Sequence, residues 1–176
     1  MKRQSRSFEI ALSATAAAVG TVFLMLGALS PFLLAAGYLV DSFALMLPLT
    51  KDFLWGSALA YLAAGLLSLF VSLWKLVPYA VFFGLHPIVN YLQRKYVKKP
   101  PFKILCLIIK AIWFDFAMWL SFYVLTAMAG MVFPDYVERF FYLILFFGGT
   151  VFFIGYDYMI FTCQKSADMA VRRIRR

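Results

Sequence analysis

The sequence predicts an all-α integral membrane protein, a bundle of six transmembrane helices in one domain that covers residues 1–176. Two observations lead to this prediction. The chain is 64% hydrophobic and 14% charged, whereas soluble domains are nearer one half apolar and one quarter charged. The apolar residues also fall into runs, several of them close to the roughly 20 residues that a membrane-spanning helix needs. We therefore expect the lipid bilayer to be its immediate surroundings.

Five basic residues within ten positions set the predicted direction of the chain. They are Arg94, Lys95, Lys98, Lys99 and Lys103. Because Lys and Arg accumulate on the cytoplasmic side of membrane proteins, we place this loop inside, and both termini with their own basic clusters follow it. The same bias explains the net charge of +9 better than nucleic-acid binding does. We expect a multi-pass protein of the bacterial cytoplasmic membrane, with both termini cytoplasmic.

The first three predicted helices occupy the N-terminal part of the chain. Residues 8–29 form a continuous apolar run that leads outward. Residues 32–50 are long enough to cross a bilayer but include Asp41 and Pro48, so we expect a bent or partly re-entrant segment that returns to the cytoplasm. Residues 54–73 make the third helix, which leads outward again.

The last three predicted helices follow the same alternation. Residues 77–92 form a short helix that Gly84 and Pro87 interrupt, since proline cannot donate a backbone hydrogen bond and clashes with the preceding turn. Residues 102–130 are long enough to span with some tilt, and residues 139–163 return the chain to the cytoplasmic side.

Charged residues at membrane depth are costly, so each of them is a candidate for a functional or pairing role. Lys110 and Asp157 lie at comparable depths in their helices, which predicts a structural ion pair between them. Asp115 lies about 140° around the helix from Lys110, so it either finds a polar partner across the bundle or contacts a ligand or ion. His86 is either a core histidine or a ligand, beside a backbone carbonyl that Pro87 leaves without a donor.

Aromatic residues are frequent in the predicted outer halves of the last three helices. Such residues form interfacial belts in membrane proteins, and they also form pockets for flat organic ligands when they converge on a few polar groups. For a pocket, we predict a substrate-binding set that combines these aromatic and polar side chains. It consists of Asp41, Tyr79, Phe83, His86, Asp115, Trp119 and Tyr123.

Several catalytic signatures are absent from the sequence. It has one histidine and two cysteines, without the spacing that holds zinc, and it has no Gly-x-Ser-x-Gly elbow. We find no nucleotide-binding loop either, so energised transport would need an ATPase from another protein. We expect no cofactor, no metal and no enzymatic activity.

The layout of the chain resembles the substrate-binding S components of energy-coupling factor (ECF) vitamin transporters. The resemblance is carried by the alanine-rich stretch Ala11-Leu-Ser-Ala14-Thr-Ala-Ala-Ala18, by Asp41-Ser42 in a bent second segment, and by the Tyr79…Phe82-Phe83-Gly84…Pro87 run. It implies capture of a small vitamin-like nutrient at the outer face, and delivery through a transmembrane coupling subunit and ATPase subunits. It also implies that Ala11, Ala14 and Ala18 dock on the coupling subunit.

Two other functions remain open on the sequence alone. One is a structural or assembly membrane protein, in which the buried charges only pair helices. The other is an intramembrane enzyme that uses Asp115 and Asp157. The identity of a nutrient does not follow from the sequence.

Overall fold

The computed structural model describes residues 2–71, 73–128, 130, 132 and 134–174, and over these residues the chain forms six consecutive helical segments without a strand. The first three are α1 (Lys2–Leu29), α2 with α3 (Pro31–Ala44 and Met46–Leu49), and α4 (Leu54–Ser68). The fourth joins η1 (Trp74–Leu76), the π-helical η2 (Tyr79–Phe83) and α5 (His86–Tyr96). The fifth is α6 (Pro100–Ala127), and the sixth joins α7 (Asp135–Leu143), the π-helical η3 (Ile144–Gly149) and α8 (Thr150–Ile174).

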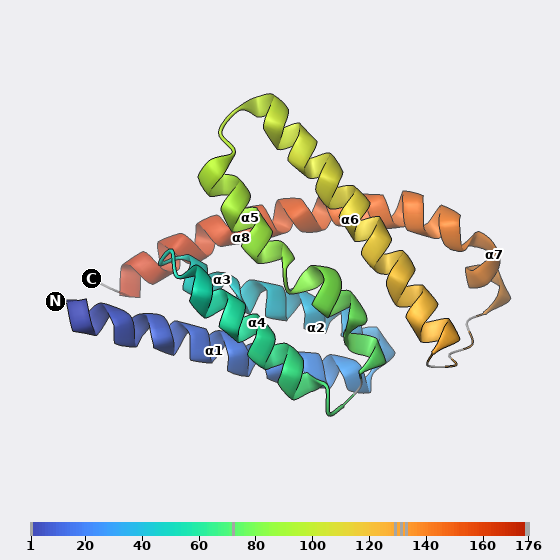
Figure 1. Ribbon diagram of the computed structural model, residues 1–176, viewed down its shortest axis with the longest axis horizontal. Helices are drawn as coiled ribbons and strands as arrows, with labels where there is room; N and C mark the ends of the chain where they lie inside the picture. The colour runs from blue at the N-terminus through green and yellow to red at the C-terminus, as the bar shows by residue number, and fades with distance from the viewer. Residues whose placement is uncertain (1, 72, 129, 131, 133, 175–176) are drawn as a thin grey trace.

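The helices are arranged around a central break in the fourth segment (Figure 1). α1 packs along α2 and α4, while α6 crosses the molecule obliquely and contacts α8, η1, η2 and η3. The start of α1 and the end of α8 lie at the same end of the molecule. The all-α architecture with six segments is therefore confirmed, whereas the placement of both termini in the cytoplasm stays a prediction.

Three of the helices are long and apolar enough to cross a membrane by length and composition. They cover Arg6–Leu29, Pro100–Ala127 and Arg139–Met169 in the described chain, with mean hydropathies of 1.9, 1.8 and 1.7. The prediction of six transmembrane helices is thus supported for three segments. Leu33–Leu49 and Leu54–Ser68 are apolar but shorter, and the broken fourth segment contains no helix of that length.

The distribution of side chains is the reverse of that in a soluble protein. Large apolar side chains face outward on every long helix, as in Trp55 (74% exposed), Ile112 (63%) and Phe147 (74%). Polar and charged side chains lie inside, among them Asp41 (0% exposed) and Lys110 (4%). In water this arrangement would expose apolar surface and bury charge, both unfavourable. It suits a protein whose perimeter contacts lipid.

Several of the predicted helices have different C-terminal ends in the structure, among them the one predicted over 77–92, which continues to Tyr96, and the one predicted over 102–130, which ends at Ala127. The helix predicted over 54–73 ends at Ser68, and the one predicted over 139–163 continues as helix to Ile174. In the second segment α2 ends at Ala44 and α3 begins at Met46, but Leu45 between them keeps helical dihedrals, so the bent or partly re-entrant path stays a prediction. The predicted break in the fourth segment is also present, between Phe83 and His86.

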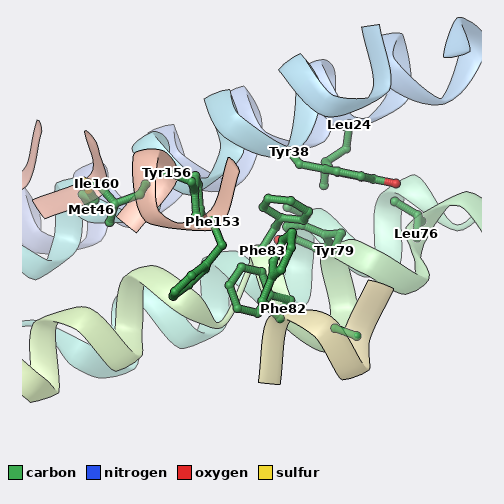
Figure 2. Close-up of a cluster of buried hydrophobic side chains, with 13 residues drawn as sticks. Leu24, Tyr38, Met46, Leu76, Tyr79, Phe82, Phe83, Phe153, Tyr156 and Ile160 are labelled. Carbon is green, nitrogen blue, oxygen red and sulfur yellow. The ribbon is translucent and has the colours of Figure 1, made fainter. Parts of the chain in front are cut away.

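An aromatic core fills the centre of the molecule (Figure 2). Phe82 is fully buried and lies at its middle, with ring centroids 4.9 Å from Trp113, 5.0 Å from Phe114 and 6.0 Å from Tyr156. These distances are within the range of favourable edge-to-face and tilted aromatic pairs. The core thus joins η2 to α6 and α8, and it also includes Leu24 of α1 and Tyr38 of α2.

Candidate functional site

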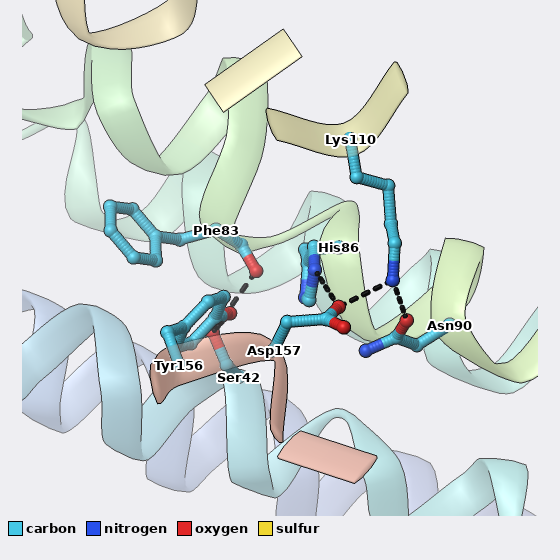
Figure 3. Close-up of polar contacts among 7 residues, drawn as sticks. All are labelled: Ser42, Phe83, His86, Asn90, Lys110, Tyr156 and Asp157. Carbon is cyan, nitrogen blue, oxygen red and sulfur yellow. Dashed lines mark hydrogen bonds and ion pairs between the residues drawn. The ribbon is translucent and has the colours of Figure 1, made fainter. Parts of the chain in front are cut away.

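Four polar side chains form a buried network where α5, α6 and α8 meet (Figure 3). The Lys110 ammonium forms an ion pair with the Asp157 carboxylate and donates a hydrogen bond to Asn90 Oδ1 at 2.7 Å. His86 Nε2 lies 3.0 Å from the same Asp157 oxygen, so a protonated Nε2 would donate to the carboxylate. The predicted contact between Lys110 and Asp157 is therefore present, and it is part of a larger network.

The helix break places His86 and Asn90 in this network. The two residues are four positions apart at the start of α5, so they lie on the same face one above the other. The break itself needs a glycine, because a Cβ at Gly84 would collide with the Tyr61 ring and lie 2.9 Å from Tyr79. α5 therefore restarts at His86 with a new direction, and its first polar face points into the bundle.

A serine from another helix replaces the backbone donor that Pro87 lacks. In a continuous helix the Phe83 carbonyl would accept from the backbone nitrogen of residue 87, but a proline nitrogen carries no hydrogen. The Ser42 hydroxyl from α2 lies 3.0 Å from that carbonyl, and the Tyr156 hydroxyl donates to Ser42 at 3.0 Å. The single Ser42 proton is shared between this carbonyl and the Tyr38 carbonyl, which lies 2.8 Å from the hydroxyl, and α2 is tied to α8 through Tyr156.

A cationic pocket of about 460 Å³, which we call the basic pocket, opens beside this network. Its lining carries four cationic side chains against one carboxylate, and that carboxylate already pairs with Lys110. The Nδ2 group of Asn90 is buried here with no hydrogen-bond partner among the described residues. The lining residues are Asn90, Gln93, Arg94, Val97, Lys98, Lys103, Lys110, Asp157 and Phe161. The chemistry of this pocket favours an anion.

Asp41 occupies a second, separate polar position, on α2. The residue is fully buried, and neither carboxylate oxygen has a hydrogen-bond partner among the described residues. Space for the carboxylate exists because residue 20 of α1 is glycine, and a Cβ there would collide with it. An unpaired carboxylate at membrane depth is costly, so Asp41 is the described acid whose surroundings most favour a proton, a cation or a polar ligand.

A small pocket of about 180 Å³ lies between α4 and η2. Tyr61 and Tyr79 line it, with ring centroids 5.4 Å apart, and Tyr79 lies close enough to Asp41 to interact with its charge. The two tyrosine hydroxyls donate to the backbone carbonyls of Ala80 and Tyr61 respectively. The structure therefore brings the predicted residues Asp41 and Tyr79 together, and adds Tyr61.

The other predicted ligand residues do not meet in one pocket. Phe83 (4% exposed) is packed in the aromatic core, and fully buried His86 belongs to the network with Asp157. Trp119 and Tyr123 lie on the outer surface of α6, 41% and 56% exposed, and stack on each other. Asp115 on α6 is partly buried, with one oxygen that has no partner among the described residues.

The three alanines predicted to dock a partner lie on the open face of α1. Ala11, Ala14 and Ala18 are exposed, while Ala16 and Gly20 on another face are buried. The buried face packs on α2 and α4. α1 therefore presents small residues on two sides, and other helices of this chain cover only one of these sides.

From the sequence alone, Asn90 is a polar candidate at membrane depth but not one of the predicted substrate-binding residues, and the basic loop indicates only topology. The spacing of His86 and Asn90 on one helix face was a usable signal for the network. Over the described residues, no group of three or more His, Cys, Asp or Glu side chains could hold a metal ion.

Comparison of the chain with known protein families, with curated proteins and with solved structures finds no match.

Proposed function

We propose that this protein is the substrate-binding membrane subunit of an ECF-type importer. In this role it would capture a small nutrient at the outer face and deliver it through a coupling subunit and ATPases. The observation that carries the proposal is the uncovered small-residue face of α1, formed by Ala11, Ala14 and Ala18. Small side chains let two helix backbones approach closely in a membrane, where packing rather than hydrophobic burial drives association.

The opposite side of α1 supports this role, because it is firmly held. Ala16 is fully buried against Ala44, Leu45 and Ala60, which fixes the orientation of α1. A partner helix would therefore meet a rigid, preformed surface. Such a surface needs no reorganisation on binding, which lowers the cost of association.

The nutrient-binding part of the proposal rests on Asp41 and the adjoining pair Tyr61 and Tyr79. A buried unpaired carboxylate beside two aromatic rings suits a small ligand with a cationic or hydrogen-bond-donating group. The pocket of about 180 Å³ is smaller than the roughly 300–1,000 Å³ of most ligand sites. Ligand entry would therefore require the tyrosine rings to move aside and join this pocket to Asp41.

The test replaces both Ala14 and Ala18 with Trp. We expect loss of uptake and loss of co-purification with the coupling complex, whereas the thermal melting temperature and ligand binding by the isolated protein stay the same. The matched control replaces Ile108 and Ile112 with Trp, because both are exposed on α6 (51% and 63%) and neither belongs to α1 or lines the pocket of Tyr61 and Tyr79. Co-purification that survives in the Ala variant, or falls equally in both variants, would exclude α1 as the docking face.

Asp41→Asn tests the binding half separately. This change removes the charge while keeping the side-chain shape, so ligand binding should fall and docking should persist. A ligand that co-purifies equally with the wild type and with Asp41→Asn would move the nutrient site elsewhere in the bundle.

A further inference from the structure

The basic pocket adjoins a second pocket of different character. This second pocket, which we call the α6 groove, has a volume of about 380 Å³ and presents mainly apolar side chains with two lysines at one end. It is lined by Tyr96, Val97, Lys98, Lys99, Phe102, Leu105 and Cys106. Val97 and Lys98 line both pockets, so a cationic chamber and an apolar groove share one wall.

We propose that these two pockets together bind one anionic phospholipid, with its phosphate in the basic pocket and an acyl chain in the α6 groove. This site is separate from the Asp41 pocket and from the α1 face, and does not depend on the importer function.

The phosphate half of the proposal rests on uncompensated positive charge. Arg94 pairs with Asp168 at 3.1 Å, and Lys110 pairs with Asp157. In the described part of the chain, Lys98 and Lys103 have no ion-pair partner, yet both line the basic pocket. A phosphate would supply the missing anion and accept several charge-assisted hydrogen bonds at once.

Asn90 provides a further donor for the head group at the floor of the pocket. Its side chain is 3% exposed, and its Nδ2 group has no partner among the described residues, while its Oδ1 is held by Lys110 at 2.7 Å. A buried amide donor without an acceptor is unfavourable, and an oxygen of the phosphate or of the glycerol would satisfy it.

The α6 groove favours a lipid over a soluble phosphorylated molecule. Phe102 and Leu105 are themselves half exposed, at 54% and 50%, on a helix apolar enough to span a membrane. Basic pockets between membrane helices bind anionic head groups on the cytoplasmic side, where anionic lipids are concentrated. The 97–99 loop is the part of the chain that the positive-inside bias places on that side.

The test measures how much phosphatidylglycerol and how much phosphatidylcholine stay bound to the full-length protein, by native mass spectrometry from detergent. The two lipids have acyl chains of equal length. We expect the wild type to retain phosphatidylglycerol preferentially. Lys98→Gln with Lys103→Gln should lower this preference roughly tenfold to thirtyfold, since each lysine near an anionic surface contributes a several-fold effect. The control, Lys51→Gln with Lys165→Gln, removes the same charge outside both pockets. An equal loss in the control would reduce the effect to general electrostatic attraction and overturn the proposal.

A second pair of variants separates a lipid from a soluble phosphate. Leu105→Trp fills the α6 groove and should weaken phosphatidylglycerol binding, whereas Ile108→Trp, on an exposed position outside the groove, should not. Glycerol 3-phosphate serves as the soluble probe and should compete only weakly. If it binds as tightly as phosphatidylglycerol and Leu105→Trp has no effect, the ligand is a soluble phosphate and the lipid proposal is wrong.

Discussion

Breaking the Lys110–Asp157 ion pair is the most direct test of how this bundle is held together. Lys110→Met leaves the Asp157 carboxylate with His86 as its remaining donor at 3.0 Å, and leaves Asn90 Oδ1 without the bond from Lys110. Removing one partner of a buried pair costs about 3–5 kcal/mol in soluble proteins. Two features reduce that figure here: the Asp157 side chain is 18% exposed, and polar groups find other partners in membrane-embedded unfolded states.

We therefore expect Lys110→Met to lower the free energy of unfolding by about 2 kcal/mol. Adding Asp157→Asn should recover about 1 kcal/mol of this loss, because the uncompensated charge is then removed as well. The measurement is reversible unfolding in mixed detergent micelles for the wild type, both single variants and the double variant. Lys165→Met serves as the control, since Lys165 is exposed on α8 and makes no ion pair among the described contacts. If the losses of the two single variants sum to the loss of the double variant within about 0.5 kcal/mol, the pair has no coupling energy and the reasoning is refuted.

Three further predictions concern packing, pH and orientation. Gly84→Ala should lower the free energy of unfolding by about 1–3 kcal/mol, because the added methyl group overpacks against Tyr61, and thermal melts measure this loss. The control is Gly155→Ala, whose added methyl group meets no atom within 4 Å and should not destabilise the protein. The hydrogen bond that Tyr91 donates to Asp52 lowers the pKa of that carboxyl. Its contribution to stability is therefore full above the unfolded-state pKa of about 4 and is lost as the pH falls from there through the lower folded-state pKa. The melting-temperature gap between wild type and Asp52→Asn should thus close under acid, and a gap unchanged at pH 3 would refute this. A topology reporter fused in the α5–α6 loop should give a cytoplasmic signal, and one fused between α6 and α7 should give an external signal. The opposite pair of signals would show that the predicted orientation in the membrane is wrong.

The sequence allowed the helical segments and one buried contact to be predicted, for identifiable reasons. Long apolar runs and interrupting prolines mark the segments regardless of how they pack. Lys110 and Asp157 could be paired because an intramembrane charge needs an opposite charge at similar depth, and the sequence has few candidates. These are properties of single helices or of a strong pairing constraint, so they need little knowledge of the tertiary structure.

The ligand set could not be predicted because the rotational phase of α6 does not follow from an apolar sequence. The structure buries Lys110, Phe114 and Ala117 of α6 and turns Trp119 and Tyr123 outward. In a soluble helix the polar face would identify the exposed side, but here both faces are apolar. The role of Ser42 was equally hidden, because it depends on α2 lying beside the break at Pro87 rather than on any local pattern.

The short α4 has a consequence for the surrounding bilayer. Its 15 residues rise about 22 Å, roughly 8 Å less than a hydrocarbon core of about 30 Å. Trp55 is 74% exposed at one end of this helix, and tryptophan anchors at the level of the lipid head groups. If α4 crosses the bilayer, lipids along this side would compress their chains, at a cost of fractions of a kcal/mol per ångström, while those along the 28-residue α6 would not need to. Such an uneven hydrophobic mismatch would give the molecule a thin flank and a thick flank, and would favour its residence in thin membranes or beside a neighbour that shields α4.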